Sequence, residues 1–424
     1  MSVPQLVLVG TSHKFAPVQL REKLNFGINE IKNWLSILTR NGNGIDEAVI
    51  LSTCNRTEIY AITDGSQNTS KHLTEIMCKW SGIPYDELAK HVYILFSEEA
   101  VGHLFAVASG LDSLVMGEQQ IQIQVRNAAR IANEVGTMGR FLSELFQSAY
   151  RAASRVRKES GLGLDRASVS SAAVSLLNSR LPSARSILII GAGKMMTLAV
   201  DNLASMTDCE ILVTNRTIQR AEALAKRLGG KVWPFEQLYS ALERVDAVLA
   251  FTSSNEHVVL AKDLEPVMVK RRNRELTLID GSVPRNIDPQ VNKILGVQLY
   301  NMDDLAPYVG DRSSDESVSN ANKAIRVEVE KFYARLRSYQ AIDTLKDLRR
   351  IAEEIRVHEL SRALNRMDKI SNRQKEIVDL LTRRIINKLL YEPMTRLKEH
   401  ASNGDGETFD AVVRELFAMG QDSE

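Results

Sequence analysis

The stretch LSTCNRTEIY (residues 51–60) places Cys54 in a cluster of small polar residues between two apolar runs. A buried cysteine normally packs as a small hydrophobe, but Thr53, Asn55 and Arg56 are not core residues. A thiol becomes a nucleophile near neutral pH in a positive, partly exposed setting, and Arg56 supplies a positive charge nearby. Residue types alone leave two interpretations for Cys54: a nucleophile, or a small residue that caps a turn.

The other cysteines, Cys78 and Cys209, lie within or beside amphipathic segments, and we expect both to be packing residues. With three widely spaced cysteines and no CxxC pair, the chain predicts no disulfide framework and a reducing compartment. The seven histidines are scattered, without HExxH or another ligand-like pair. We therefore predict no metal site built from protein ligands.

A second candidate site is Gly191-Ala192-Gly193, which directly follows the apolar run 186–190 and precedes a predicted helix. In this strand–glycine–helix context, glycines let the backbone approach a pyrophosphate that rests on the helix N-terminus. Met196 replaces the third glycine of the pattern, so we expect close packing to be relaxed there. The match predicts a dinucleotide-binding loop, although an imperfect one.

The end of the next predicted strand (210–215) indicates which dinucleotide is bound. NAD enzymes usually place an acid there to bind the ribose 2′-hydroxyl. This chain carries Asn215-Arg216-Thr217, with Arg220 one turn later. A carboxylate would repel a 2′-phosphate, whereas a guanidinium can bind it bidentately. We therefore predict NADP(H) rather than NAD(H); the alternative is a degenerate Rossmann domain with a solvated arginine.

Taken together, the two sites predict a particular chemistry. A cysteine beside a nicotinamide can take an acyl group as a thioester, which a hydride then reduces to an aldehyde. An NADP enzyme that acts on a ketone or an alcohol would need a Lys/Asp or Tyr/Lys pair instead. The presence of Cys54 favours the thioester route.

The elements that must position Cys54 are predicted in the order βαββαβ. Strands are expected at 5–10, 47–52, 57–63 and 91–96, with helices at 29–40 and around 70–80. This order is that of the split-βαβ or ferredoxin-like fold. It places Cys54 in the short connection between the second and third strands. More helices are expected at 98–109 and across 118–160.

The middle of the chain, residues 156–310, alternates strand and helix. Buried strands are predicted at 186–190, 210–215, 246–251 and 276–280, with a helix at 217–228. Such alternation predicts a parallel sheet with helices on both faces, the Rossmann arrangement.

The C-terminal segment, residues 311–424, is predicted to be helical. Neither glycine nor proline occurs between 311 and 392, so helices can run long. Apolar residues recur at helical spacing, namely Leu348, Ile351, Ile355, Leu364 and Met367, and then Ile377, Leu380, Leu381, Ile385 and Leu389. A narrow bundle has little interior, so we expect these stripes to pair with a second copy of the chain. The alternative is a monomeric bundle that docks on the middle segment.

The composition is that of an ordinary globular protein, 44% hydrophobic and 25% charged, with a net charge of +1. This balance excludes neither a nucleic-acid partner nor an acidic substrate. The N-terminus lacks a signal-peptide pattern, and no apolar run approaches the roughly 18 residues of a membrane span. We expect a cytoplasmic protein; a plastid stroma stays open if a transit peptide was removed before residue 1.

Five stretches resemble the glutamyl-tRNA reductase family. They are GTSHKFAPVQLRE (10–22), STCNRTE (52–58), HLFAVASGLDSLVMGEQQI (103–121), VPRNIDP (283–289) and NMDDL (301–305). The likeness covers nearly the whole chain in the same order. It implies a catalytic, glutamyl-tRNA-binding domain (1–155), an NADPH-binding Rossmann domain (156–310) and a helical dimerisation domain (311–424).

The resemblance also implies a reaction and its partners. Cys54 would attack the ester between glutamate and its tRNA, and NADPH would reduce the resulting thioester to glutamate-1-semialdehyde. This is the first committed step of tetrapyrrole biosynthesis by the five-carbon route. The implied partners are glutamyl-tRNA, a second copy of the chain, and glutamate-1-semialdehyde aminomutase as a transient acceptor of the aldehyde.

The resemblance assigns further site residues. Those implied for substrate binding are Thr53, Cys54, Asn55, Arg56, Ser113, Glu118, Gln119, Gln120 and Gln124. Arg56 suits a glutamate carboxylate, and Glu118 suits an α-amino group. His103 matches a histidine important for activity, with proton transfer as the implied role; its residue type alone favours a capping or core histidine. Those implied for cofactor binding are Gly191, Ala192, Gly193, Lys194, Met195, Met196, Asn215, Arg216 and Thr217.

Three places depart from the family's pattern. Gln122 and Ile123 stand where a Leu-Gly pair is usual, Lys194 replaces a glutamate, and GSVPR (281–285) lacks the usual small apolar residues before VPR. The first change bears on the packing near Gln124, and Lys194 bears on the local geometry of the nucleotide loop.

Two other functions stay open. One is a small-molecule NADP dehydrogenase of the shikimate type, which the turn Asn215-Arg216-Thr217 suggests. The other is a non-catalytic dimer that senses or binds charged tRNA. A tRNA partner fits the basic stretch 151–158 and the excess of Lys and Arg over Asp and Glu in 321–400. The chain has no RRM, KH or similar RNA-binding signature, so the tRNA prediction depends on the resemblance.

Overall fold

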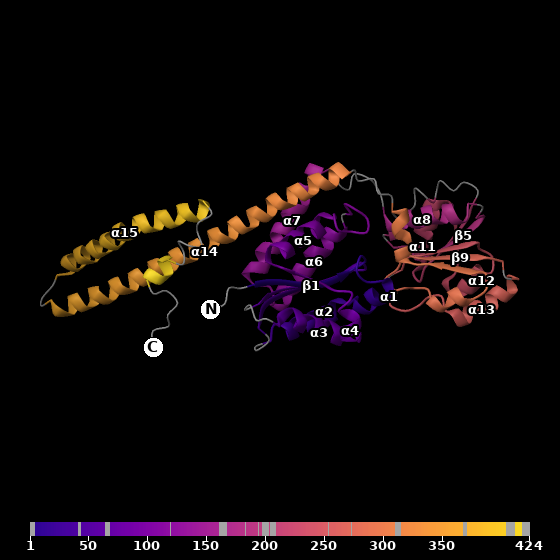
Figure 1. The fold of residues 1–424 in the computed structure, drawn as a ribbon, viewed down its shortest axis with the longest axis horizontal. Helices are drawn as coiled ribbons and strands as arrows, with labels where there is room; N and C mark the ends of the chain where they lie inside the picture. The colour runs from indigo at the N-terminus through magenta and orange to yellow at the C-terminus, as the bar shows by residue number, and fades with distance from the viewer. Residues whose placement is uncertain are drawn as a thin grey trace. The chain divides into compact units, whose positions relative to one another are not determined.

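The structure is a computed structural model in which two compact units can be separated, Met1–Arg326 and Val327–Glu424 (Figure 1). It describes residues 5–40, 44–63, 68–118, 120–160, 168–182, 184–193, 195–196, 203, 209–252, 254–272, 274–309, 315–367, 371–403 and 412–417.

The first unit begins with a four-stranded antiparallel sheet in the order β2-β3-β1-β4. Its strands are β1 (Gln5–Ser12), β2 (Ile45–Ser52), β3 (Arg56–Thr63) and β4 (Tyr93–Phe96). The intervening helices are α1 (Val18–Arg21), η1 (Glu22–Leu24), α2 (Ile28–Leu38), α3 (Thr69–Ser81) and α4 (Tyr85–Leu88). The predicted βαββαβ order is confirmed.

Three helices follow and pack on this sheet: α5 (Ser97–Ser109), α6 (Gln120–Val135) and α7 (Arg140–Ser160). The helical stretch expected across 118–160 is two helices, because Gly136 adopts a left-handed φ of 80° and ends α6. Between α5 and α6 the chain folds back on itself at two glycines. A Cβ added to Gly110 would lie 3.0 Å from the backbone of Gly117, so this close approach requires glycine.

The rest of the first unit contains a six-stranded parallel sheet in the order β10-β9-β8-β5-β6-β7. Its strands are β5 (Ser186–Ile190), β6 (Glu210–Thr214), β7 (Lys231–Val232), β8 (Ala247–Ala250), β9 (Leu276–Asp280) and β10 (Val297–Tyr300). The described helices are α8 (Val169–Arg180), α11 (Ile218–Leu228), η2 (Phe235–Gln237), α12 (Leu238–Leu242), α13 (Ala261–Lys270), η3 (Pro289–Lys293) and η4 (Met302–Tyr308).

The apolar run of β5 shows why these strands form a doubly covered sheet. Ile187 and Ile189 belong to the core on one face, and Leu188 and Ile190 belong to the core on the other. A strand buried on both faces is apolar at every position rather than at alternate ones. The predicted Rossmann architecture is confirmed, and the short edge strands β7 and β10 are additions to it.

The second unit is built from the part of α14 (Asp315–Arg366) that follows Arg326 and from α15 (Asn372–Asn403). The expectation of long helices is confirmed. A small core of Leu345, Leu348, Leu390 and Val413 forms within this unit. The stripe of α15 is exposed in the single chain, at Ile377, Leu380, Leu381, Ile385 and Leu389. None of the helices within the described ranges is long and apolar enough to cross a membrane.

Candidate active site

Cys54 occupies the tight connection between β2 and β3. The last register pair before the connection is Ser52 with Thr57. Thr53 closes it, because its hydroxyl accepts hydrogen bonds from the backbone N–H groups of Asn55 (3.2 Å) and Arg56 (3.1 Å). Its own N–H donates to the carbonyl of Arg56 at 2.8 Å. The turn therefore presents Cys54, which is half-buried, at its tip.

A buried arginine, Arg21 of α1, holds the same turn from the N-terminal side. Its Nη1 donates to the carbonyl of Cys54 (2.9 Å) and to Oδ1 of Asn55 (3.0 Å). The backbone N–H of His13 also donates to the carbonyl of Asn55 at 2.9 Å. Asn55 is thus fixed through its side chain and its backbone, which limits the freedom of the neighbouring cysteine.

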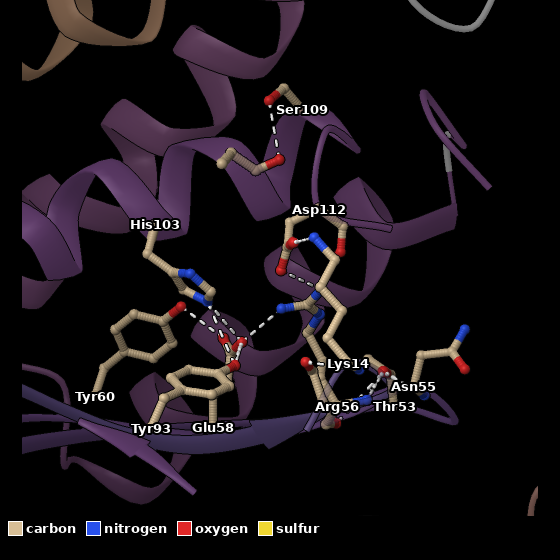
Figure 2. Close-up of polar contacts among 12 residues, drawn as sticks. Lys14, Thr53, Asn55, Arg56, Glu58, Tyr60, Tyr93, His103, Ser109 and Asp112 are labelled. Carbon is tan, nitrogen blue, oxygen red and sulfur yellow. Dashed lines mark hydrogen bonds and ion pairs between the residues drawn. The ribbon is translucent and has the colours of Figure 1, made fainter. Parts of the chain in front are cut away.

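Beside the turn lies a buried ionic cluster centred on Glu58 of β3 (Figure 2). The fully buried carboxylate accepts hydrogen bonds from Arg56 Nη1 (2.6 Å) and from the hydroxyls of Tyr60 (2.6 Å) and Tyr93. His103 Nε2 lies 2.8 Å from Oε1 of Glu58. Burial would raise the pKa of Glu58, but His103 and Arg56 lower it well below its usual range. Glu58 is therefore a carboxylate.

The guanidinium of Arg56 is shared between two acids. Its Nη1 binds Glu58, and its Nη2 binds the carboxylate of Asp112 (3.0 Å) and the backbone carbonyl of the same residue. Asp112 also pairs with Lys14. Burial would lower the pKa of Arg56, but Glu58, Tyr93 and Asp112 raise it above its usual range. Arg56 is a permanent cation whose charge is already balanced.

Fifteen of the predicted site residues line one cavity of about 530 Å³. From the catalytic side these are Thr53, Cys54, Asn55, Arg56, Ser113, Glu118, Gln120 and Gln124. From the nucleotide side they are Gly191, Ala192, Gly193, Met195, Asn215, Arg216 and Thr217. The nucleophile candidate and the glycine loop therefore open into the same space.

The other four predicted residues are not among the described residues that line this cavity. His103 is not among the described residues that line it; its Nε2 is turned to Glu58 and its ring lies 5.2 Å from that of Tyr93. Met196 is fully buried in the core that packs against β5. Gln119 and Lys194 lie outside the described residues.

The thiol of Cys54 is not activated in this state. Burial and the charge of Glu118 raise its pKa to about 11, although Arg21 and Arg56 act in the opposite direction. The positive influence expected from Arg56 is therefore present but outweighed. Near neutral pH Cys54 is a protonated thiol, and a charge change near Glu118 would alter its reactivity.

The glycine loop fits a dinucleotide. Gly191 has φ +101°, and a Cβ there would lie 2.3 Å from the carbonyl oxygen of Phe251, so only glycine fits. A Cβ on Gly193 would meet nothing within 4 Å, which leaves room for a pyrophosphate to approach the backbone. Oδ1 of Asn215 accepts from the N–H of Ala192 at 3.4 Å and so links the loop to the end of β6.

At the far end of the cavity, Arg216 follows β6. Its Nη2 donates to Oγ of Ser254 (3.3 Å), and its guanidinium lies 5.9 Å from the ring centre of Phe235. Arg220 also lines the cavity. Two guanidinium groups at the position where NAD enzymes place an acid suit a 2′-phosphate.

Sequence reasoning did not single out Arg21, Glu58 or Asp112. All three lie within the stretches that carry the family resemblance, which was the available signal. Their residue types gave no further indication, because a charged residue beside a strand is usually solvated. Only the fold shows that they are buried or joined to the Cys54 turn.

Comparisons with known proteins cover nearly the whole chain. The family model of the glutamyl-tRNAGlu reductase N-terminal domain matches residues 9–160, and that of the glutamyl-tRNAGlu reductase dimerisation domain matches 320–419. The shikimate/quinate 5-dehydrogenase model matches 175–308, which identifies this part as a nicotinamide-dinucleotide domain.

Curated relatives are similar over their full length. A glutamyl-tRNA reductase of Syntrophotalea carbinolica is 38% identical over 99% of this chain and 95% of its own. One of Synechococcus sp. (strain JA-3-3Ab) is 36% identical over 98% of this chain and 97% of its own. The solved glutamyl-tRNA reductase of Methanopyrus kandleri is 28% identical, covers 98% of this chain and 99% of its own, and has a TM-score of 0.49. On the family models and the identity to the two curated relatives, the chain belongs to the glutamyl-tRNA reductase family.

Proposed function

We propose that this protein reduces the glutamyl group of glutamyl-tRNA to glutamate-1-semialdehyde with NADPH, through a thioester on Cys54, and releases the tRNA. This reaction is the first step of tetrapyrrole biosynthesis by the five-carbon route. One observation carries the proposal beyond family membership: Cys54 and the loop Gly191–Gly193 line the same cavity. A thioester formed there would lie within reach of a bound nicotinamide.

The composition of the cavity argues against a shikimate-type dehydrogenase. Such an enzyme needs a Lys/Asp or Tyr/Lys pair, and the described residues that line this cavity include no lysine, tyrosine or aspartate. The cavity instead offers one thiol, amide side chains and Glu118. This set suits acyl transfer rather than reduction of a ketone.

In the first half-reaction, Sγ of Cys54 attacks the carbonyl carbon of the ester. The bond from that carbon to the terminal ribose oxygen breaks, and the tRNA leaves with a hydroxyl that has gained the proton lost by the thiol. In the second, the same carbon would accept a hydride, which is the chemistry that a bound NADPH would supply. The carbon–sulfur bond then breaks, and Cys54 regains a proton as the aldehyde is released.

Glu118 is proposed to bind the α-ammonium of the glutamyl group. Its charge contributes to the raised pKa of Cys54, so a bound ammonium would cancel that repulsion and favour the thiolate. Substrate binding would thereby activate the nucleophile. Ser113, Gln120 and Gln124 line the same cavity and are proposed to bind the remaining polar groups of the substrate, as is Gln119, which lies outside the described residues.

Arg56 is proposed to bind the side-chain carboxylate of the glutamyl group. Because Glu58 and Asp112 already share its guanidinium, the substrate carboxylate would compete with Asp112, the partner nearer the surface. His103 is proposed to influence proton transfer at the substrate indirectly. Its Nε2 contacts Glu58, and Glu58 in turn binds Arg56. In this proposal His103 influences the substrate pocket without lining it.

NADPH is the proposed cofactor, held by the glycine loop with Met195 and, at its 2′-phosphate, by Arg216 and Thr217. Replacing Arg216 by glutamine is expected to lower the ratio of kcat/KM for NADPH over NADH about 10- to 100-fold, because a bidentate charge-assisted contact is lost. Steady-state kinetics with both cofactors measure this ratio. Arg227→Gln, in the last turn of α11, is the control and should leave the ratio unchanged. An unchanged ratio in Arg216→Gln would contradict the assignment.

Gly191 should matter for the stability of the fold, and Gly193 for the binding of the cofactor. Gly191→Ala is expected to lower the free energy of unfolding by at least about 2 kcal/mol, because its Cβ meets a backbone carbonyl at an unfavourable φ. Gly193→Ala should leave stability within about 0.5 kcal/mol but raise the KM for NADPH about tenfold, because its Cβ occupies open space in the cavity. Denaturant melts and kinetics separate the two effects. Equal effects of both substitutions on stability would contradict this assignment.

The remaining proposals follow the family. Residues 1–155, 156–310 and 311–424 are proposed as catalytic, NADPH-binding and dimerisation domains. The match to a dimerisation domain and the exposed apolar stripe of α15 support a homodimer. A cytoplasmic location and a transient complex with glutamate-1-semialdehyde aminomutase are proposed from the family resemblance alone.

The direct test is to incubate the purified protein with NADPH and glutamyl-tRNA and to measure semialdehyde and released tRNA. The proposal expects both products in equal amounts. Binding of charged tRNA without either product would favour the non-catalytic alternative and overturn the proposal.

A further inference from the structure

The catalytic part and the nucleotide-binding part of the first unit meet along residues 18–25. The backbone N–H of Val18 donates to Oδ2 of Asp303 at 2.8 Å, and Arg21 forms an ion pair with Oδ1 of the same carboxylate. Asp303 lies in the first turn of η4, next to Met302, which lines the cavity. Asp303 is therefore attached to the wall of the proposed nucleotide site.

The same guanidinium reaches the Cys54 turn. While Nη2 of Arg21 binds Asp303, its Nη1 donates to the carbonyl of Cys54 and to the side chain of Asn55. Its Nε donates to the carbonyl of Ala16 at 3.1 Å. The side chain is 2% exposed, so water does not compete for these contacts. A single planar group thus joins the nucleotide-binding part to the backbone of the candidate nucleophile.

We propose that Arg21 is a positioning residue through which Asp303 of the nucleotide-binding part sets the position and reactivity of Cys54. The proposal rests on the function proposed above in taking Cys54 as the nucleophile. It adds that the nucleophile turn is complete only while the nucleotide-binding part is in place. Acylation and reduction would then be coupled through a fixed contact, in addition to sharing a cavity.

The physical basis is the cost of a buried, uncompensated charge. Without Asp303, the cation of Arg21 would lose its carboxylate partner inside the protein. The guanidinium would turn toward other acceptors or water, and its hydrogen bonds to the Cys54 turn would weaken, because its fork is rigid. Burial and Glu118 raise the pKa of Cys54, whereas the charges of Arg21 and Arg56 lower it. Displacement of Arg21 would therefore make the thiol less reactive.

A second ion pair crosses the same boundary and provides a matched control. Glu22, the next residue along the chain, binds Arg285 in a bidentate manner, with Nε–Oε2 and Nη2–Oε1 distances of 2.9 and 2.5 Å. Within the part of the chain that the structure describes, neither side chain forms a hydrogen bond or an ion pair with the Cys54 turn. Loss of the Glu22–Arg285 pair would loosen the boundary without affecting the nucleophile directly.

The test measures how fast iodoacetamide alkylates Cys54 in the full chain. Cys78 and Cys209 are first replaced by serine, so that the reaction reports on Cys54. In this background, Arg21→Gln is expected to lower the alkylation rate at about pH 8 at least about fivefold, because the thiolate loses a nearby positive charge. Asp303→Asn is expected to lower the rate in the same direction, because the guanidinium of Arg21 is released from the Cys54 turn. Glu22→Gln should stay within about twofold of the parent.

Three outcomes decide the matter, with thermal melts confirming that each variant is folded. A slower reaction in Asp303→Asn and Arg21→Gln but not in Glu22→Gln supports the coupling. Equal rates in all variants, or an equal decrease in Glu22→Gln, overturn it. Because alkylation needs neither tRNA nor NADPH, this readout is independent of the reductase assay: a failed reductase assay would refute only the proposed function.

Discussion

Replacing Cys54 by serine is expected to lower kcat/KM for semialdehyde formation at least about 1,000-fold. A serine hydroxyl is a far weaker nucleophile than a thiolate. The charges of Arg21 and Arg56 can stabilise a thiolate at this turn, but neither group is a base that would deprotonate a serine. An oxygen ester would also be a poorer hydride acceptor than a thioester. The measurement is the rate of NADPH oxidation and of aldehyde formation with glutamyl-tRNA.

Cys78→Ser is the matched control for this prediction. Cys78 is also a half-buried free cysteine, but it lies on α3 and does not line the cavity. We expect the reductase activity of the Cys78→Ser protein to stay within about twofold of the parent. Without NADPH, mass spectrometry of the parent should find a glutamyl group on the peptide that contains Cys54. A Cys54→Ser protein that retained substantial activity would refute the thioester route.

Replacing Glu58 by glutamine is expected to destabilise the protein by about 3–5 kcal/mol. Glu58 is fully buried, and its carboxylate accepts from Arg56 and from two tyrosines. The substitution leaves the buried charge of Arg56 with Asp112 alone and places an amide where only an acceptor fits. Urea unfolding of parent and variant measures the difference.

Glu210→Gln is the control. Glu210 is also a glutamate on a strand, β6, and it forms an ion pair with Lys231, but this pair is exposed at the surface. Its loss should cost no more than about 1 kcal/mol, as is usual for exposed ion pairs. Comparable losses in the two variants would show that the Glu58 cluster contributes no special stability.

The contribution of Glu58 should also depend on pH. Its folded-state pKa is lowered, so the folded protein keeps the carboxylate to a lower pH than the unfolded chain, whose value is about 4.3. The stabilisation is complete above that value and is lost as the pH falls toward the folded-state pKa. We expect the stability gap between the parent and Glu58→Gln to narrow below about pH 4. A gap that did not change with pH would mean that the charge of Glu58 is not what stabilises the cluster.

Local patterns explain how much of this molecule could be predicted from its sequence. The strands around Cys54 were predictable because apolar runs and a short polar connection lie close together in sequence. The glycine loop was predictable because its function depends on adjacent residues. Gly136 divided a predicted helical stretch because one left-handed residue outweighs the surrounding helical pattern.

The parts that could not be predicted depend on contacts between distant segments. The resemblance assigned Arg56 to a glutamate carboxylate, and only the fold shows that Asp112, 56 residues away, also binds its guanidinium. The resemblance implied a role in proton transfer for His103, and its contact with Glu58, 45 residues away, is visible only in the fold. Arg21 is separated from Asp303 by 282 residues. Residue types and spacing carry no information about such pairings.

The raised pKa of Cys54 has a consequence for the protein under oxidative stress. Peroxides attack thiolates to form sulfenic acid, and further oxidation is irreversible. With a pKa of about 11, on the order of one molecule in ten thousand carries the thiolate at pH 7. The resting protein therefore keeps its sulfur in the form that peroxide attacks slowly. A nucleophile that is activated only when substrate arrives would survive conditions that inactivate permanently ionised cysteines.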